Sequence, residues 1–117
     1  MARFLIDGQK LCLRLNWMEK LEAAHANVRV PLAAVSSVRS VAAAWPELRG
    51  IRAPGTGIPG VIAVGTRRGP FGKDFAAVHG KGSAVVVECE NGPYQRIVAT
   101  HEHSEDIASM IRGRTPR

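Results

Sequence analysis

The chain has 117 residues, of which 45% are hydrophobic, so it has the length of one domain and enough apolar residues for one core. Sixteen Lys and Arg residues against ten Asp and Glu residues give a net charge of +6 at pH 7. This composition excludes a wholly disordered chain. Two cysteines, Cys12 and Cys89, lie far apart and outside any Cys-x-x-Cys pattern, which excludes a disulfide framework and a cysteine-rich zinc site. We expect both thiols to be buried and inert.

The hydrophobic segments are all short. None approaches the roughly 18 apolar residues that span a bilayer, so we expect no transmembrane segment. The apolar part of residues 1–7 is too short for a signal peptide. The sequence therefore predicts a cytoplasmic protein.

The first elements in chain order are a hairpin and a helix. The apolar residues 4–6 end at the turn dipeptide Asp7-Gly8, and the next residues alternate between leucine and other side chains as far as Leu15, which predicts a β-hairpin. Asn16 and Glu19 have the spacing of a capping box, in which each side chain accepts a backbone N–H of the other residue. They predict a helix of about two turns over residues 18–25.

The next segment predicts strands. Residues 28–31 are β-branched and end at Pro31, which is typical of a strand end or an edge strand. Residues 32–44 combine alanines with regularly spaced valines, and they predict one turn followed by a strand over residues 37–43. Trp45, which is followed by Pro46, is expected to end a strand and pack over the core.

Residues 50–82 hold nine of the twelve glycines and predict hairpins. Residues 61–66 and 74–79 read as strands joined by a four-residue loop over residues 69–72. Residues 83–90 predict a buried strand, and Asn91-Gly92 is a hairpin signal that leads into a strand over residues 94–100.

The last element is an amphipathic helix. It begins at Ser104, carries acids in its first turn and apolar residues on one face, and ends with Arg112 before Gly113. Residues 114–117 are expected to fray. The whole pattern predicts a single, mainly β domain over residues 1–117, with about seven short strands in a sandwich or barrel, an early helix and a C-terminal helix.

The order of these elements resembles the pleckstrin-homology-like (PH-like) domains of bacteria, in particular the small stand-alone proteins of actinobacteria. The resemblance covers nearly the whole chain and rests on these short motifs: Val30-Pro31, Arg52-Ala-Pro-Gly-Thr56, Ile58-Pro-Gly60, Gly65-Thr66, Gly72-Lys73-Asp74-Phe75, Val85-Val-Val87 and Ile97-Val-Ala99. It implies a partly open antiparallel β-barrel capped by the C-terminal helix. It also implies a domain that binds partners or assembles with itself.

The lipid-binding motif of eukaryotic PH domains is incomplete in this chain. Lys10 and Arg14 occupy two of its basic places, but Asn16 stands in the third. The resemblance therefore does not carry phosphoinositide binding over to this protein.

Motifs that carry chemistry are also incomplete. Residues 55–60 match G-x-G-x-x-G, but a Val/Ile-rich strand follows instead of a helix, so we expect a tight irregular loop and not a dinucleotide site. His101 and His103 supply two ligands, whereas a zinc site needs three or four. No nucleophile elbow or paired carboxylates are present. We expect no cofactor, no metal and no enzymatic activity.

The surplus positive charge is concentrated in the glycine-rich middle of the chain. Residues 49–81 carry six basic residues and one acid, a net +5, whereas residues 82–108 carry five acids and Arg96, a net −4. The candidate partner-binding residues are Arg49, Arg52, Arg67, Arg68 and Lys73.

Several roles remain open for these basic residues. They can be solvated surface residues, or a docking surface for an acidic protein, including the acidic face of a second copy. A small anionic ligand or a nucleic acid is the alternative, although few aromatic residues accompany the charges and no recognition helix is evident. An anionic membrane surface is disfavoured because the last helix begins with acids. We expect a non-enzymatic binding module.

Overall fold

The computed structural model describes residues 2–16, 18–20 and 27–115, with the backbone alone for residues 52–56. The described residues form nine strands, one α-helix longer than a turn and two 3-10 turns. In chain order the elements are β1 (Arg3–Asp7), β2 (Lys10–Arg14), β3 (Val28–Pro31), η1 (Leu32–Ala34), β4 (Val35–Val41), η2 (Trp45–Glu47), β5 (Ile51–Ile58), β6 (Ile62–Gly69), β7 (Gly72–His79), β8 (Ala84–Cys89), β9 (Arg96–Thr100) and α2 (Ser104–Arg112).

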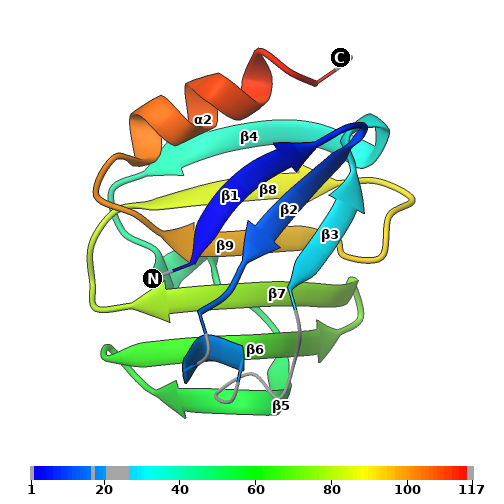
Figure 1. The fold of residues 1–117 in the computed structure, drawn as a ribbon. Helices are drawn as coiled ribbons and strands as arrows, with labels where there is room; N and C mark the ends of the chain where they lie inside the picture. The colour runs from blue at the N-terminus through cyan, green and yellow to red at the C-terminus, as the bar shows by residue number, and fades with distance from the viewer. Residues whose placement is uncertain (1, 17, 21–26, 116–117) are drawn as a thin grey trace.

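The strands form two sheets that pack face to face. The smaller sheet has the order β1-β2-β3, and the larger has the order β4-β8-β9-β7-β6-β5. Figure 1 shows the small sheet lying across one part of the large sheet, with α2 along β4. The mainly β fold with a C-terminal helix confirms the prediction at this level. The described strands number nine instead of about seven, and the two sheets form no closed barrel.

One strand pair is parallel, although the hairpin pattern predicts antiparallel pairing throughout. β9 returns from the β8–β9 hairpin and inserts between β8 and β7, where it runs antiparallel to β8 and parallel to β7. Sequence periodicity cannot show this insertion, because it fixes the face of each side chain but not which strand lies beside which. The insertion places Arg96 of β9 opposite Glu88 on one side and Asp74 on the other.

The main core fills the space between the two sheets and the helix. Phe4, Leu11 and Leu13 come from the small sheet, and Phe75 and Ile97 come from the large sheet. α2 closes the core with Ala108 and Ile111, both of them fully buried. The alternation of leucines along β2 predicted this face correctly, because a strand places every second side chain on the same side of a sheet.

A second apolar cluster covers the opposite face of the large sheet. Small residues of β6, β7, β8 and β9 meet the segment that runs from the end of β4 to Leu48. The Nε1–H of Trp45 donates to the carbonyl oxygen of Gly80 at 2.8 Å, which ties this segment to the loop after β7. The predicted packing of Trp45 is confirmed, but the residue lies in η2 and is half-buried. The large sheet is therefore covered on both faces.

The hairpins are present with loops of other lengths than predicted. The β6–β7 turn consists of Pro70 and Phe71, since Gly69 and Gly72 still pair with each other. The β8–β9 loop spans residues 90–95 and contains Asn91 at a φ of 60°. The predicted loop over residues 55–60 is wrong for residues 55–58, which belong to the edge strand β5, and the turn spans residues 59–61.

The two predicted helices have different outcomes. Residues 18–20 are helical, and residues 21–25 of the predicted helix lie outside the described residues. The capping box is confirmed, because the N–H of Asn16 donates to Oε1 of Glu19 at 3.0 Å and the N–H of Glu19 donates to Oδ1 of Asn16 at 2.8 Å. α2 forms where predicted. Among the described residues, no helix has the length and apolar character needed to cross a membrane.

Candidate functional site

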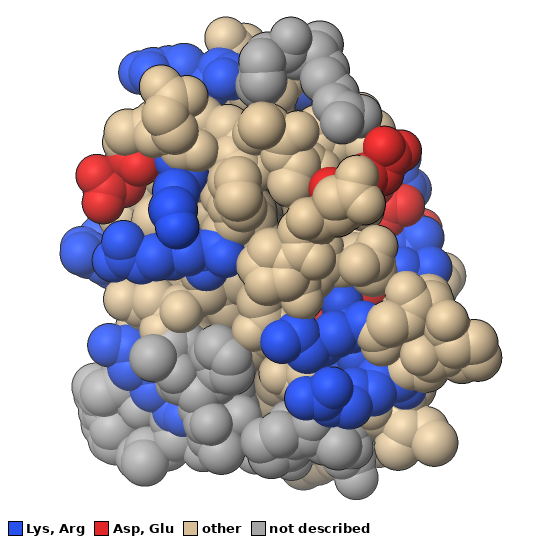
Figure 2. All heavy atoms as spheres, turned by 90° about the vertical axis from the view of Figure 1, so that its right-hand side faces the viewer, with Lys and Arg blue, Asp and Glu red and all other residues tan. Residues whose placement is uncertain are grey.

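The predicted partner-binding residues gather at one end of the large sheet, near the β6–β7 turn. In the strand register Arg67 lies opposite Asp74 and Arg68 lies opposite Lys73, so the two arginines point to opposite faces of the hairpin. Arg49 lies just before β5, and the side chain of Arg52 lies outside the described residues. Figure 2 looks onto this end and shows Lys and Arg side chains in separate groups, with Asp and Glu side chains at the margins.

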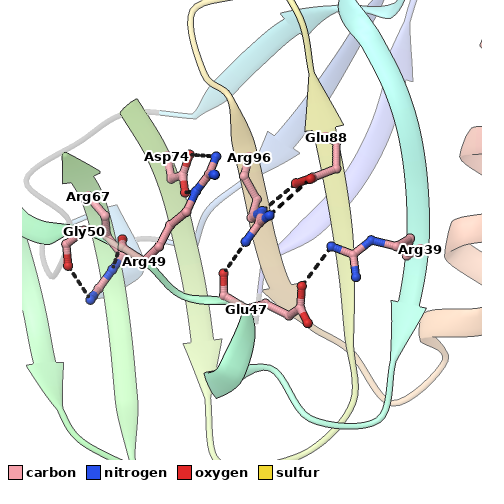
Figure 3. Close-up of polar contacts among 8 residues, drawn as sticks. All are labelled: Arg39, Glu47, Arg49, Gly50, Arg67, Asp74, Glu88 and Arg96. Atoms are coloured by element: carbon pink, nitrogen blue, oxygen red, sulfur yellow. Dashed lines mark hydrogen bonds and ion pairs between the residues drawn. The ribbon is translucent and has the colours of Figure 1, made fainter. Parts of the chain in front are cut away.

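On one face of the hairpin, charged side chains form a row that crosses four strands. Glu88 of β8, Arg96 of β9, Asp74 of β7 and Arg67 of β6 are neighbours in the register and alternate in sign. We call these four residues the charge ladder (Figure 3). Alternating charges on neighbouring strands stabilise a sheet, whereas equal charges would repel.

Arg96 is the central cation of the charge ladder. Its Nε and Nη2 both donate to the carboxylate of Glu88, the latter at 3.2 Å, so the pair is bidentate. Hydrogen bonding to Glu88 raises the pKa of Arg96 above its usual value, against the opposing effect of burial. Its Nη1 donates to the carbonyl oxygen of Glu47 at 2.9 Å. Arg96 therefore connects the sheet to the segment that covers it.

Asp74 is the buried anion of the charge ladder, with only 3% of its surface exposed. Its carboxylate accepts two hydrogen bonds from Arg49, from Nε at 2.7 Å and from Nη2 at 3.2 Å. The guanidinium of Arg49 also lies 4.1 Å from the centre of the Phe71 ring, a cation–π geometry. The guanidinium of Arg49 is therefore held by two groups of the protein itself, the Asp74 carboxylate and the Phe71 ring.

Further bonds fix the backbone around Arg49 to the sheet. Arg67 donates from Nε to the carbonyl oxygen of Arg49 at 3.0 Å and from Nη2 to that of Gly50 at 3.1 Å (Figure 3). Arg39 of β4 forms an ion pair with Glu47 at 2.8 Å. Residues 47–50 are thus clamped across the strands, and two of the five candidate residues, Arg49 and Arg67, have structural partners.

The other face of the hairpin carries Arg68 and Lys73. These two cations lie directly opposite each other on neighbouring strands, an arrangement that is unfavourable for the fold. The Nζ of Lys73 lies 4.6 Å from the centre of the Tyr94 ring, and the Tyr94 ring meets Phe75 edge-on at 6.0 Å. Burial raises the pKa of Tyr94, so the ring stays neutral beneath the lysine. Within the described part of the chain, neither Arg68 nor Lys73 forms an ion pair with an acid.

Sequence reasoning missed Asp74, Glu88 and Tyr94 as members of this site. Counting charges along the chain gives Asp74 as a lone acid among cations, but it does not show which cation it meets. A signal was available in Gly69-Pro70-Phe71-Gly72, because a two-residue turn at Pro70 and Phe71 places residue 67 opposite residue 74.

The other residues that the sequence singles out are the histidines near the last helix and the two cysteines. The N–H of His103 donates to Nδ1 of His101 at 2.9 Å, so this histidine nitrogen has a backbone partner. No group of three His, Cys, Asp or Glu side chains in the described residues is placed to hold a metal ion. Cys12 and Cys89 are free and buried, as predicted. Burial and the charge of Glu88 raise the pKa of Cys89 to about 11, so its thiol is protonated and unreactive near neutral pH.

Comparison with other proteins assigns no family. The chain has no significant match to any family model, to any curated protein or to any solved structure. What the protein does must therefore be inferred from the charges and contacts of this chain. The feature that stands out is the division of the β6–β7 hairpin into one face whose cations are paired internally and one face whose cations lie opposite each other.

Proposed function

We propose that this protein is a non-enzymatic binding module that docks an acidic protein surface on the face of the β6–β7 hairpin that carries Arg68 and Lys73. The observation that carries the proposal is the direct opposition of these two cations in the register. Like charges in this arrangement destabilise the fold, and an anionic partner would neutralise them, so the relief of their repulsion would favour binding.

Arg49 and Arg67 support this surface from behind. Arg49 donates to Asp74 of β7, and Arg67 of β6 donates to the carbonyl oxygens of Arg49 and Gly50. These bonds join residues 47–50 to the hairpin and keep its end rigid. A rigid surface loses less conformational entropy on binding than a mobile one. In this proposal Arg68 and Lys73 contact the partner, and Arg49 and Arg67 position them.

A second copy of the chain is one acidic partner that fits. Glu102, Glu105 and Asp106 surround the start of α2, and Figure 1 places the start of α2 and the β6–β7 turn at opposite ends of the strands. A basic surface at one end and an acidic one at the other allow head-to-tail contacts, which produce rings or open chains. The proposal covers such self-assembly together with binding to another acidic protein.

Membership of the PH-like proteins and a cytoplasmic location belong to the same proposal. The small size, the predominance of β-strands and the C-terminal helix against the sheet support PH-like membership. Two free cysteines support a reducing compartment.

The test uses light scattering at high protein concentration, in about 50 mM and about 500 mM salt, where the Debye length falls from about 14 Å to about 4 Å. An acidic decapeptide is titrated in parallel and followed by fluorescence anisotropy. We expect assembly or peptide binding at low salt, and its loss at high salt and in the double variant Arg68→Glu/Lys73→Glu. The matched control, Lys10→Glu/Lys81→Glu, makes the same change in charge elsewhere and should bind like the unmodified protein.

Three results would overturn the proposal. The first is a monomer that ignores the acidic peptide at low salt. The second is binding that the control variant loses as readily as the hairpin variant, since it would reflect net charge alone. The third is tighter binding to a single-stranded oligonucleotide than to the peptide, with affinity falling linearly in log salt, which would favour a nucleic-acid binder instead.

A further inference from the structure

The solvent face of the small sheet is a second basic surface, separate from the hairpin. Along β1, β2 and β3 the core residues alternate with outward-facing ones, so the outer face is set by the register. Four of its side chains are cations and one is an anion. The outward-facing residues are Arg3, Leu5, Asp7, Lys10, Cys12, Arg14, Arg29 and Pro31.

The charges on this face are poorly neutralised by the protein. Arg3 lies directly opposite Arg14, a second case of equal charges paired across neighbouring strands. The one ion pair on this face joins Nη1 of Arg29 to Oδ2 of Asp7 at 3.7 Å, between side chains that are 56% and 74% exposed. An exposed pair of this length contributes little to stability. In the described residues, Arg3 and Arg14 form no ion pair.

A cavity of about 290 Å³ opens between these charges. Leu5, Cys12 and Arg29 stand in one row across the three strands, so the leucine and the thiol form an apolar floor beside the guanidinium of Arg29. Cys12 is only 6% exposed and belongs to neither apolar cluster of the core, as expected for the bottom of a surface cavity. Arg14 lines the cavity as well.

The rim of this cavity is fixed by the backbone. Oδ1 of Asn27 accepts the N–H of Leu15 at 2.8 Å, which holds the Asn27 amide where it lines the cavity. Arg14 and Arg29 lie on neighbouring strands of a paired sheet, so their Cα atoms cannot move apart independently. The strand pairing therefore fixes the apolar floor and the Cα positions of the two arginines that flank it.

We propose that this cavity binds a small organic oxyanion, a carboxylate or phosphate monoester that carries a ring or a branched alkyl group. The guanidinium groups of Arg14 and Arg29 present forked N–H donors that match the oxygens of such an anion. Leu5 and Cys12 take the apolar part. The volume lies at the lower end of the range for small-molecule sites, which favours a ligand of about ten non-hydrogen atoms over a polymer. The site is distinct from the hairpin surface and does not depend on it.

The test is an NMR titration of the full chain, with backbone amide signals as the readout and four probes. Benzoate and phenyl phosphate carry both the ring and the anion, benzyl alcohol carries the ring alone, and inorganic phosphate carries the anion alone. We expect saturable shifts at the amides of Leu5, Cys12 and Arg29 with one or both aromatic anions, at least tenfold tighter than with the other two probes. The tighter of the two aromatic anions identifies the headgroup.

Substitutions separate this site from general charge attraction. Arg14→Gln and Arg29→Gln should each weaken binding at least tenfold, whereas Asp7→Asn should strengthen it, because Asp7 competes for Arg29. Lys81→Gln removes one exposed charge elsewhere and should bind the probe like the unmodified protein, and so should the hairpin variant Arg68→Glu/Lys73→Glu. The amide spectrum also shows that each variant is folded.

Three results would overturn the inference. The first is the absence of saturable shifts at these three amides with both aromatic anions. The second is unchanged affinity in Arg14→Gln and Arg29→Gln, and the third is equal affinity for benzyl alcohol, since either would show that the guanidinium groups do not recognise the ligand.

Discussion

The Asp74→Asn substitution removes one negative charge from the charge ladder while keeping the shape of the side chain. In the folded protein the Asp74 carboxylate is almost completely buried and accepts two hydrogen bonds from Arg49. In the register it also lies between two further cations, Arg96 on β9 and Arg67 on β6. The amide would offer one acceptor in place of two charged ones, and its NH₂ group would face guanidinium donors. We therefore expect the substitution to destabilise the fold.

The size of the loss follows from these contacts. Breaking a buried ion pair by removing one partner costs about 3–5 kcal/mol, and a single charge-assisted hydrogen bond contributes about 1.5–3 kcal/mol. The side chain of Arg49 is 34% exposed, so water can solvate part of the abandoned guanidinium and the loss falls below the buried limit. We expect the free energy of unfolding to fall by about 2–3 kcal/mol. For a chain of this length that corresponds to a decrease in Tm of about 8–12 °C.

The assay is urea unfolding followed by tryptophan fluorescence, in a double-mutant cycle with Arg49→Gln. The cycle should give a coupling energy of about 1–2 kcal/mol, because the two residues lose the same bonds. The control is Arg68→Gln on the other face of the hairpin, which should change stability by less than about 0.5 kcal/mol. A loss below about 0.5 kcal/mol for Asp74→Asn, or additive effects in the cycle, would show that the charge ladder does not hold residues 47–50 in place.

Three further predictions concern the glycines, a cysteine and the capping box. Gly50 and Gly80 both have positive φ, so Gly80→Ala should cost about 1–2 kcal/mol in urea unfolding. Gly50→Ala should cost more, because the added methyl group would also lie 2.6 Å from a backbone carbonyl oxygen, whereas nothing lies near it at Gly80. Equal losses for the two variants would contradict this. Burial raises the pKa of Cys89 to about 11, so between about pH 9 and 11 the folded state keeps a proton that the unfolded chain loses. The free energy of unfolding should therefore fall as the pH rises through this range, and Cys89→Ala should reduce that fall. The same pH dependence in the variant would contradict this role of the Cys89 thiol. Asn16→Ala removes the acceptor of the Glu19 N–H and should cost about 1 kcal/mol in thermal unfolding, and a variant as stable as the unmodified chain would show that this cap is dispensable.

Local signals in the sequence predicted the elements whose causes are local. The capping box needs two side chains three residues apart, and the alternation along β2 needs only one strand with a buried face. α2 has acids in its first turn, Arg112 in its last turn and Gly113 as its C-cap, although its N-cap is His103 and forms no side-chain cap. Such signals are complete in one segment of chain, so their outcome does not depend on what packs beside them.

β5 shows where local signals fail. The glycine-rich residues 55–60 predict a loop, yet residues 55–58 pair with β6, as do Ile51 and Arg52 at the start of β5. β5 is an edge strand, so its residues need hydrogen bonds on one side only. The register shift between Arg52 and Gly55 places Pro54 in a bulge, where the missing N–H interrupts no regular pairing. Tertiary pairing therefore overrode a weak local preference.

The sequence indicated where the basic residues lie, but not which acids pair with them. The basic residues do gather at one end of the large sheet, as the local excess of charge indicated. Asp74 pairs with Arg49, which is 25 positions away along the chain, and Arg96 reaches Asp74 through a parallel strand pair that no hairpin pattern predicts. Which cations are neutralised is a property of the register, and the register depends on the insertion of β9 between β7 and β8.

Among the sixteen cations of the chain, two groups therefore have different physical consequences. Arg49, Arg67 and Arg96 donate to buried or backbone acceptors, so removing any of them should lower the free energy of unfolding. The pairs Arg68 with Lys73 and Arg3 with Arg14 oppose each other, and a neutral residue at one position of each pair would relieve the repulsion. Stability and binding should thus respond to different substitutions, and variants at the opposed pairs should bind more weakly while unfolding no more easily, or even less easily, than the unmodified protein.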